Sequence, residues 1–207
     1  MTKFDLQKIL RSDLTRLTRM YSLEPFQKLS TPEIGCLINL LVEVIPYSAC
    51  YLNIGTGAGY SLVAGAAWNS EKMCIGVDNW SEMQESKYLH DRIYPYKNVR
   101  FYEMDYKEYF KQHILPIGLY YYDADHSAEA TYEGLSLAVP FMYEGSQILI
   151  DDWNWEMVRD GAFEFLKANP EYSIIYEEFT EVPVEDTSEK MHRLCEMYNG
   201  ICIMRRN

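Results

Sequence analysis

The stretch YLNIGTGAGYS, residues 51–61, determines the fold class of this chain. An apolar run that reads as a strand over residues 50–54 leads directly into three glycines in G-x-G-x-G spacing: Gly55, Gly57 and Gly59. Glycines permit a tight turn and let a ligand approach the backbone, and a helical pattern begins immediately afterwards, over residues 60–69. A strand, a glycine-rich turn and a helix in this order are typical of the ligand-binding unit of a doubly wound sheet.

Strands and helices alternate along the rest of the chain. Further strands are predicted over residues 73–78, 99–104, 117–123, 146–151, 172–179 and 200–205. Helices are predicted from Tyr106 and over residues 128–142 and 155–168. This alternation predicts an α/β fold with a doubly wound, mostly parallel sheet of seven strands that helices cover on both faces. Because no helical crossover joins the last two strands, we expect the final strand to be antiparallel.

Two helices precede the sheet. Leucines recur at helical spacing near the N-terminus, at Leu6, Leu10, Leu14 and Leu17. A second helix is predicted over residues 30–45, because this segment opens with a capping serine and has a proline in its first turn. We therefore expect a single domain over residues 1–207, with a helical cap over residues 1–46 and an α/β core over residues 47–207.

Composition and charge argue against several classes of protein. The 207-residue chain has a formal net charge of −12, which argues against a nucleic-acid partner, since phosphate binding needs clustered lysine and arginine. No apolar run is long enough to cross a membrane, and the N-terminal region lacks the apolar core of a signal peptide. Five scattered cysteines without a C-x-x-C pair indicate reduced thiols in the core. We expect a cytoplasmic protein.

An acidic segment over residues 180–199 joins the last two predicted strands. Between Glu177 and Glu189 there are six acidic residues and no basic one. This composition favours a solvated surface loop, and a lid over the ligand site is the alternative.

Asp78 is the first candidate ligand-binding side chain outside the glycine turn. It ends the second strand of the sheet, 23 residues after Gly55, where a carboxylate can accept hydrogen bonds from both hydroxyls of a ribose. Asp105, after the third strand, could meet an adenine amino group or simply cap the next helix. Dinucleotide-binding enzymes usually show G-x-G-x-x-G, whereas the third glycine here comes one residue early. These positions favour a nucleoside-containing ligand other than a nicotinamide dinucleotide.

Carboxylates also follow two later strands. Asp123 ends the fourth strand in YYYDADH, residues 120–126, and the pair Asp151 and Asp152 ends the fifth strand in ILIDDWNW. In a parallel sheet both ends lie at the same edge as the glycine turn, and neighbouring strands are about 4.8 Å apart. Converging carboxylates repel one another unless a hard divalent cation binds them, and oxygen ligands suit Mg²⁺, Ca²⁺ or Mn²⁺. The alternative is that each carboxylate group only caps a helix.

These motifs resemble those of the metal-dependent, S-adenosylmethionine-dependent O-methyltransferases, over roughly residues 31–180. YLNIGTGAGYS is similar to the family's first motif. YYYDADH and ILIDDWNW are similar to the segments that carry metal ligands in its caffeoyl-CoA, catechol and macrocin-type members. The resemblance implies a Rossmann-like methyltransferase fold with an antiparallel seventh strand. It also implies an S-adenosylmethionine site formed by Asn53, Gly55, Gly57, Gly59, Ser61, Asp78, Asn79, Asp105, Tyr106 and Asp123.

The resemblance further implies a role for each residue of the acidic segments. A divalent cation, Mg²⁺ or alternatively Mn²⁺ or Ca²⁺, would be held by Asp123, Asp151 and Asp152. The position of the catechol-type base is occupied by His126, and that of the macrocin-type base by Asp125. We expect Asp125 to be the base and His126 the second candidate, because a carboxylate suffices once a cation has acidified the hydroxyl. The chain departs from the family at Asn53, where an acidic residue is usual.

The predicted function is methyl transfer from S-adenosylmethionine to a hydroxyl of a small molecule with vicinal oxygens, either a sugar or a catechol-like compound. One alternative is a non-catalytic S-adenosylmethionine-binding or scaffold protein, which Asn53 and the acidic loop keep open. The other is a nicotinamide-dependent oxidoreductase, against which the early third glycine and the three carboxylates argue. We expect no nucleic-acid or membrane partner, and a homodimer is left open.

Overall fold

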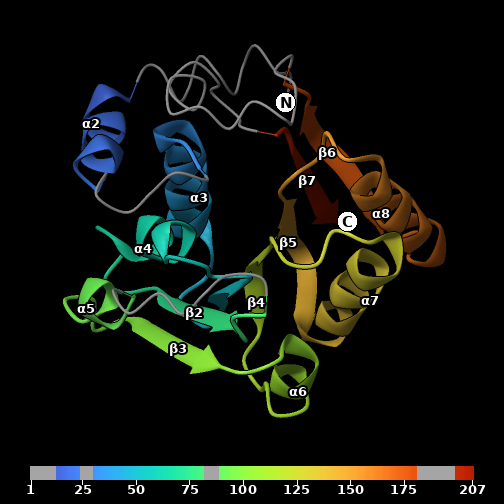
Figure 1. Ribbon diagram of the computed structural model, residues 1–207, viewed down its shortest axis with the longest axis horizontal. Coiled ribbons are helices and arrows are strands. Elements are labelled where there is room, and N and C mark those ends of the chain that lie inside the picture. The colour runs from blue at the N-terminus through green and yellow to red at the C-terminus, as the bar shows by residue number, and fades with distance from the viewer. Residues whose placement is uncertain (1–12, 24–29, 82–88, 181–198) are drawn as a thin grey trace.

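The computed structural model describes residues 13–23, 30–81, 89–180 and 199–207, and a seven-stranded sheet forms its centre (Figure 1). The strands are β1 (Cys50–Ile54), β2 (Met73–Asp78), β3 (Val99–Glu103), β4 (Ile117–Tyr122), β5 (Met142–Ile150), β6 (Tyr172–Glu178) and β7 (Ile201–Arg206). Their order across the sheet is β3-β2-β1-β4-β5-β7-β6. Strands β1 to β5 pair in parallel, whereas β7 is antiparallel to both β5 and β6. The predicted fold class, with its antiparallel last strand, is confirmed.

The order of the strands changes direction between β1 and β4. The chain runs outward from β1 through β2 to β3 and then returns to place β4 on the other side of β1. Ligands of doubly wound sheets bind at such a switch point, outside the carboxyl ends of the strands. The glycine turn that follows β1 and the segment YYYDADH at the end of β4 therefore lie side by side at this edge.

Helices cover both faces of the sheet, because successive side chains of a strand point to opposite faces. The helices are α2 (Leu14–Ser22), α3 (Pro32–Val44), α4 (Tyr60–Ala66), α5 (Leu89–Ile93), α6 (Tyr106–Phe110), α7 (Ala128–Ala138), the 3-10 helix η2 (Val139–Phe141) and α8 (Glu156–Ala168). Tyr51 and Tyr121 face a core shared with α2, α3 and α4, and Leu52, Tyr120 and Tyr122 face a core shared with α6, α7 and α8 (Figure 1). Among the described residues, no helix combines the length and the apolar character needed to cross a membrane.

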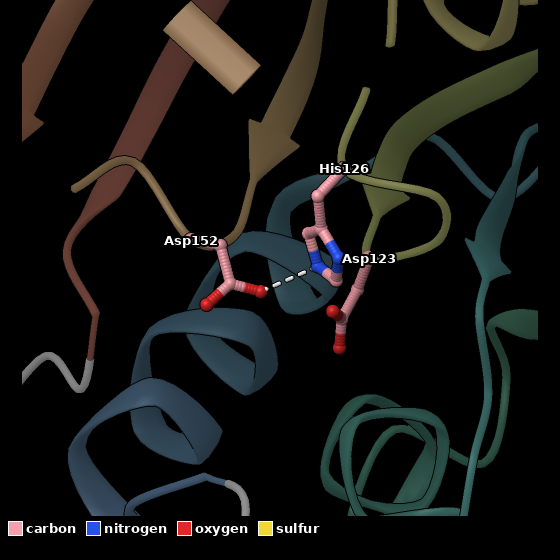
Figure 2. A group of neighbouring side chains, drawn as sticks. All are labelled: Asp123, His126 and Asp152. Carbon is pink, nitrogen blue, oxygen red and sulfur yellow. Dashed lines mark ion pairs between the residues drawn. The ribbon is translucent and has the colours of Figure 1, made fainter. Parts of the chain in front are cut away.

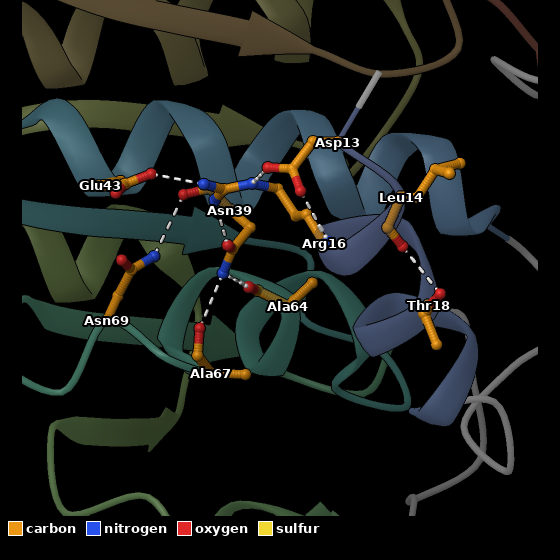
Figure 3. A network of polar contacts seen from close by, with 9 residues as sticks. All are labelled: Asp13, Leu14, Arg16, Thr18, Asn39, Glu43, Ala64, Ala67 and Asn69. Carbon is orange, nitrogen blue, oxygen red and sulfur yellow. Dashed lines mark hydrogen bonds and ion pairs between the residues drawn. The ribbon is translucent and has the colours of Figure 1, made fainter. Parts of the chain in front are cut away.

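A polar network joins the N-terminal helices to one another (Figure 3). Arg16 in α2 donates to the side chains of Asn39 and Glu43 in α3. The buried amide of Asn39 in turn donates to the carbonyl oxygens of Ala64 and Ala67, at 2.6 and 2.7 Å, where α4 ends. These bonds satisfy carbonyl groups that a helix end leaves unpaired. They fix α3 against α4, the helix that follows the glycine turn.

Several predicted boundaries differ from those in the structure. The helix predicted over residues 128–142 ends at Ala138, because Pro140 cannot continue the helical hydrogen bonds. Strand β5 begins at Met142 rather than at residue 146, and its register against β4 shifts near Gly145, which has φ +87°. Helix α5 lies in a charged segment for which no helix was predicted. Residues 1–12 of the first predicted helix and residues 181–198 of the predicted loop lie outside the described residues.

Four of the five cysteines lie within the described residues, and all four are buried free thiols: Cys36, Cys50, Cys74 and Cys202. Burial raises the pKa of each of these thiols, since it disfavours the thiolate. They are therefore packing residues rather than nucleophiles near neutral pH. Cys195 lies outside the described residues.

Candidate functional site

The glycine turn after β1 brings the ends of β1 and β4 into backbone contact. Gly55 has φ +79°, and a Cβ atom added there would lie 1.6 Å from the carbonyl oxygen of Asp123. The backbone nitrogen of Asp123 donates to the carbonyl oxygen of Ile54 at 3.0 Å. Gly57 and Gly59 also have positive φ values, 50° and 96°. The turn therefore requires glycine for its backbone conformation and, at Gly55, for the close approach of β4 as well.

The carboxylate of Asp78 is held against this turn. Its Oδ2 atom accepts from the backbone nitrogen of Gly57, and its Oδ1 atom accepts from that of Trp80, both at 2.7 Å. Each carboxylate oxygen has a second lone pair, so the group can still accept hydrogen bonds from a ligand. Its place beside the turn is compatible with the predicted contact to a ribose.

Asn79 and Asp105 lie beside each other at the ends of β2 and β3. The Nδ2 atom of Asn79 donates to Oδ2 of Asp105 at 3.5 Å. Asp105 also accepts from the backbone nitrogen of Lys107 at 2.8 Å and so caps α6, which is the alternative that its sequence position offered. Tyr106 follows in the first turn of α6, and its ring meets the ring of Tyr122 edge-on, with 6.3 Å between the centroids.

Asn53 is buried in β1, just before the glycine turn. Its Oδ1 atom accepts from the hydroxyl of Ser61 in α4 at 3.1 Å. Its Nδ2 atom is buried and has no hydrogen-bond partner among the described residues, which is rare for a buried amide. An amide can donate where a carboxylate cannot, so Asn53 suits an acceptor group of a ligand at the turn.

Asp123, His126 and Asp152 converge at the carboxyl ends of β4 and β5 (Figure 2). One ligand atom from each of these residues lies within 4.8 Å of the other two. Nε2 of His126 lies 2.7 Å from Oδ2 of Asp152. All three side chains are half-buried, so the group is open to a ligand but partly shielded from water. We call these three residues the Asp–His–Asp cluster.

Asp151 lies outside the Asp–His–Asp cluster and is buried. The hydroxyl of Tyr121 donates to its Oδ2 atom, and the backbone nitrogen of Asp152 donates to its Oδ1 atom at 2.9 Å. Burial, and after it the charge of Asp152, raises the pKa of Asp151 to about 7. Asp151, a predicted metal ligand, is thus paired with Tyr121 inside the protein. His126 lies beside the other two predicted ligands, Asp123 and Asp152.

Asp125 is likewise separate from the Asp–His–Asp cluster. It is exposed, and its Oδ1 atom accepts from the backbone nitrogen of Ser127 at 2.8 Å, before the first turn of α7. This backbone hydrogen bond lowers the pKa of Asp125. The hydroxyl of Tyr122 donates to the carbonyl oxygen of Asp125 at 2.9 Å and helps to hold the chain in this turn.

Residues 52–153, which contain the glycine turn and the carboxyl ends of β1 to β5, match a family model for a methyltransferase domain. Residues 52–153 form a methyltransferase domain. The prediction that the chain is a methyltransferase is thereby confirmed. A search of curated protein sequences gives no match.

Solved structures extend the likeness of this methyltransferase to almost the whole chain. The O-methyltransferase from Bacillus cereus in complex with SAH is 16% identical, with a TM-score of 0.63, and the alignment covers 100% of this chain and 92% of that one. TomG, an O-methyltransferase of tomaymycin synthesis from Streptomyces achromogenes in complex with SAM, is 15% identical, with a TM-score of 0.62. That alignment covers 96% of this chain and 89% of TomG. At these identities the likeness shows the shared fold.

Asn199, which the sequence did not indicate, contacts the Asp–His–Asp cluster of the methyltransferase, and Asn154 makes further hydrogen bonds in the same loop. Asn199 donates from Nδ2 to Oδ1 of Asp152 at 2.6 Å. Asn154 donates to the hydroxyl of Thr180 at 2.8 Å and accepts from its backbone nitrogen at 3.1 Å. Thr180 and Asn199 are the described residues on either side of residues 181–198. Both are hydrogen-bonded to the loop between β5 and α8. The Asn-Gly pair before β7 is a turn signal, but its contact with Asp152 depends on the order of the strands.

The two tryptophans after β5 have different surroundings. Trp153 is fully buried in the core, and its Nε1 atom donates to the carboxylate of Glu177 at 3.0 Å. Trp155 is half-buried, and the centre of its ring system lies 4.5 Å from that of His126. Of the two, Trp155 is therefore the one that borders the Asp–His–Asp cluster.

Proposed function

We propose that the protein is an S-adenosylmethionine-dependent O-methyltransferase that uses a divalent cation. Its acceptor is a small molecule with two neighbouring oxygens, either a catechol-like compound or a vicinal diol of a sugar. The observation that carries the proposal is the backbone contact between Gly55 and Asp123. It makes the glycine turn and the Asp–His–Asp cluster immediate neighbours, so a methyl donor on one side would adjoin a hydroxyl on the other, as methyl transfer requires.

S-adenosylmethionine is the proposed methyl donor, and the SAH and SAM complexes of the two similar O-methyltransferases support this choice. Asp78 would accept the ribose hydroxyls, and the adenine would be bordered by Asn79, Asp105 and Tyr106. The Nδ2 atom of Asn53, for which the described part of the chain supplies no partner, would donate to the carboxylate of the methionine part. Ser61 fixes the orientation of that amide, because its hydroxyl donates to Oδ1.

The Asp–His–Asp cluster fits a divalent cation, because two carboxylates and an imidazole supply three donor atoms on one side of the strand ends. A bound cation supplies Lewis acidity that lowers the pKa of a neighbouring hydroxyl. Asp151 would contribute from outside the coordination sphere, since its Oδ1 atom accepts from the backbone nitrogen of Asp152 and so helps to position that ligand.

In the proposed reaction a C–O bond forms at the acceptor oxygen while the C–S bond of the sulfonium breaks, and the sulfur leaves as a neutral thioether. The hydroxyl proton passes to a group of the Asp–His–Asp cluster. Asp125, the base expected from the sequence, would first have to release the backbone nitrogen of Ser127. Its lowered pKa also makes it a weaker proton acceptor.

Asp78→Ala is expected to weaken S-adenosylmethionine binding by well over about tenfold, because a charged acceptor of two hydrogen bonds is lost. Isothermal titration calorimetry of both proteins measures this loss. Asp78→Asn, which keeps an acceptor for the turn, and the thermal unfolding of each variant separate lost contact from lost folding. Glu103→Ala is the matched control, because this exposed carboxylate pairs in register with Asp78 on β3 and is expected to leave the affinity unchanged. Equal affinities of Asp78→Ala and wild type would contradict the ribose contact.

A product screen tests the acceptor. The protein is incubated with S-adenosylmethionine, Mg²⁺ or Mn²⁺, and pairs of compounds that differ only in whether a second oxygen adjoins the hydroxyl. We expect methylated product, detected by its mass, from the vicinal compounds, and much less from their single-hydroxyl partners. Equal turnover of both members of each pair would contradict the requirement for neighbouring oxygens.

A further inference from the structure

We infer that the cation of this methyltransferase is bound by a mixed set of ligands, the carboxylates of Asp123 and Asp152 and the imidazole of His126, and is a transition-metal ion in preference to Mg²⁺. The inference rests on the proposed function and deepens it. It gives His126 a role in binding the metal, and it leaves Asp151 and Asp125 out of the coordination sphere.

The distances in the Asp–His–Asp cluster suit ligands of one ion. Two donor atoms that each lie about 2.1 Å from a metal, at right angles to each other, are about 3.0 Å apart. Nε2 of His126 and Oδ2 of Asp152 are 2.7 Å apart. One ring nitrogen of His126 and one carboxylate oxygen each of Asp123 and Asp152 lie within 4.8 Å of one another. Small rotations of the side chains would therefore allow all three atoms to face one ion.

Neighbouring groups hold two of these three ligands in place. Asn199 donates to Oδ1 of Asp152 at 2.6 Å, and this bond turns Oδ2 toward His126. The ring of Trp155 lies 4.5 Å from the imidazole and restricts its rotation. Partners that orient the ligands in this way are a regular feature of metal sites in proteins.

Two other carboxylates near the strand ends are already engaged. Asp151 is buried and bound by the hydroxyl of Tyr121 and by the backbone nitrogen of Asp152. A cation on Asp151 would compete with the Tyr121 contact, and loss of that contact would leave a fully buried hydroxyl without this partner, which is costly. Asp125 is bound by the backbone nitrogen of Ser127. The imidazole of His126 is therefore the third donor that requires the least rearrangement.

An imidazole among the ligands changes which ion the site prefers. Carboxylates alone suit Mg²⁺, Ca²⁺ and Mn²⁺, whereas imidazole nitrogen suits Fe²⁺, Co²⁺ and Zn²⁺. Mg²⁺ binds nitrogen poorly and keeps much of its water.

A coordinated Nε2 atom has no lone pair left for a proton, so the proton of the acceptor hydroxyl would go to a carboxylate of the cluster.

The test is a titration of the 207-residue chain with Co²⁺, followed by visible absorption, and a competition with Mg²⁺. We expect wild type to bind Co²⁺ more tightly than Mg²⁺ by about tenfold or more. His126→Gln should lose most of this preference while it still binds Mg²⁺, and it should change the Co²⁺ spectrum because a nitrogen ligand is removed. Asp125→Asn is the matched control on the neighbouring residue and should behave as wild type.

Two outcomes would overturn the inference. If His126→Gln leaves the spectrum and the preference unchanged, His126 is not a ligand, and its contact with Asp152 serves another purpose. If neither Co²⁺ nor Mg²⁺ binds wild type, the cluster is not a cation site. Calorimetry with S-adenosylmethionine on the same samples keeps the two proposals apart. If S-adenosylmethionine binds and neither metal ion does, the methyl donor of the proposed function stands and its cation is refuted.

Discussion

Gly55→Ala is expected to lower the free energy of unfolding by roughly 2–3 kcal/mol and to abolish cofactor binding. A residue with a Cβ atom at φ +79° costs about 1–2 kcal/mol by itself. The new Cβ atom would also lie 1.6 Å from the carbonyl oxygen of Asp123, so the ends of β1 and β4 must separate. This separation strains the hydrogen bond from the backbone nitrogen of Asp123 to the carbonyl oxygen of Ile54. Loss of that bond lowers the free energy of unfolding by about 1 kcal/mol more.

Gly145→Ala separates the two causes of this loss. Gly145 has a similar φ value, +87°, but no atom lies within 4 Å of a Cβ atom added there. This variant should therefore lose only the backbone cost, about 1–2 kcal/mol, and should bind S-adenosylmethionine normally. Urea unfolding followed by circular dichroism measures both variants. Equal losses in the two would mean that the close approach of β4 contributes nothing.

Asp151→Asn is expected to stabilise the metal-free protein above neutral pH, by on the order of 2–4 kcal/mol at about pH 8. Burial and the charge of Asp152 raise the pKa of Asp151 to about 7 in the folded state, whereas an unfolded aspartate titrates near pH 4. Between these values the folded state binds more protons than the unfolded state. This carboxyl therefore makes stability fall as the pH rises from about 4 to about 7, and an asparagine removes that fall.

The difference in stability between Asp151→Asn and wild type, measured across this pH range with a chelator present, isolates the carboxyl from other titrating groups. It should be small near pH 4 and largest above pH 7. Tyr121→Phe tests the same contact in the opposite direction. Loss of the hydroxyl that donates to Asp151 raises the pKa of that carboxyl further and should destabilise the protein most at high pH. A difference between Asp151→Asn and wild type that does not vary with pH would show that Asp151 titrates normally.

The sequence was sufficient to predict the fold because its signals are local and repeated. Strands β1 and β2 have the predicted boundaries, since each is a short apolar run that ends at a glycine or an aspartate. The antiparallel β7 was predicted because the sequence shows no clear pattern of a helical crossover between the last two strands, and β7 is antiparallel to β5 and β6. One boundary was wrong because the helical pattern was extended past Pro140. This proline ends the long helix before β5.

The residues of the candidate site could be predicted only in part. Sheet order placed the strand ends at one edge, and this is why Asp123 and Asp152 were both expected there. The direction of each side chain depends on backbone turns that the residue types do not specify. Asp152 has φ 53°, and the chain after Asp123 turns instead of continuing as a strand. An extended chain would have brought Asp125 to the site, whereas the actual turn brings His126.

Partners that are distant in sequence could not be predicted at all. Tyr121 is part of a buried aromatic run, and nothing near it in the sequence indicates that its hydroxyl donates to Asp151, directly after the neighbouring strand β5. Asn199 meets Asp152 only because β7 inserts between β5 and β6. Such contacts are set by the order of the strands, so they require the structure.

Calorimetric titration of the wild-type protein with S-adenosylmethionine, and separately with NAD⁺, tests the central claim most directly. The proposed function predicts saturable binding of one molecule of S-adenosylmethionine per chain and no heat of binding with NAD⁺. The glycine turn, Asp78 and Asn53 are the groups that would make this distinction. Binding of NAD⁺ in place of S-adenosylmethionine, or no binding of either compound by a correctly folded protein, would contradict the account.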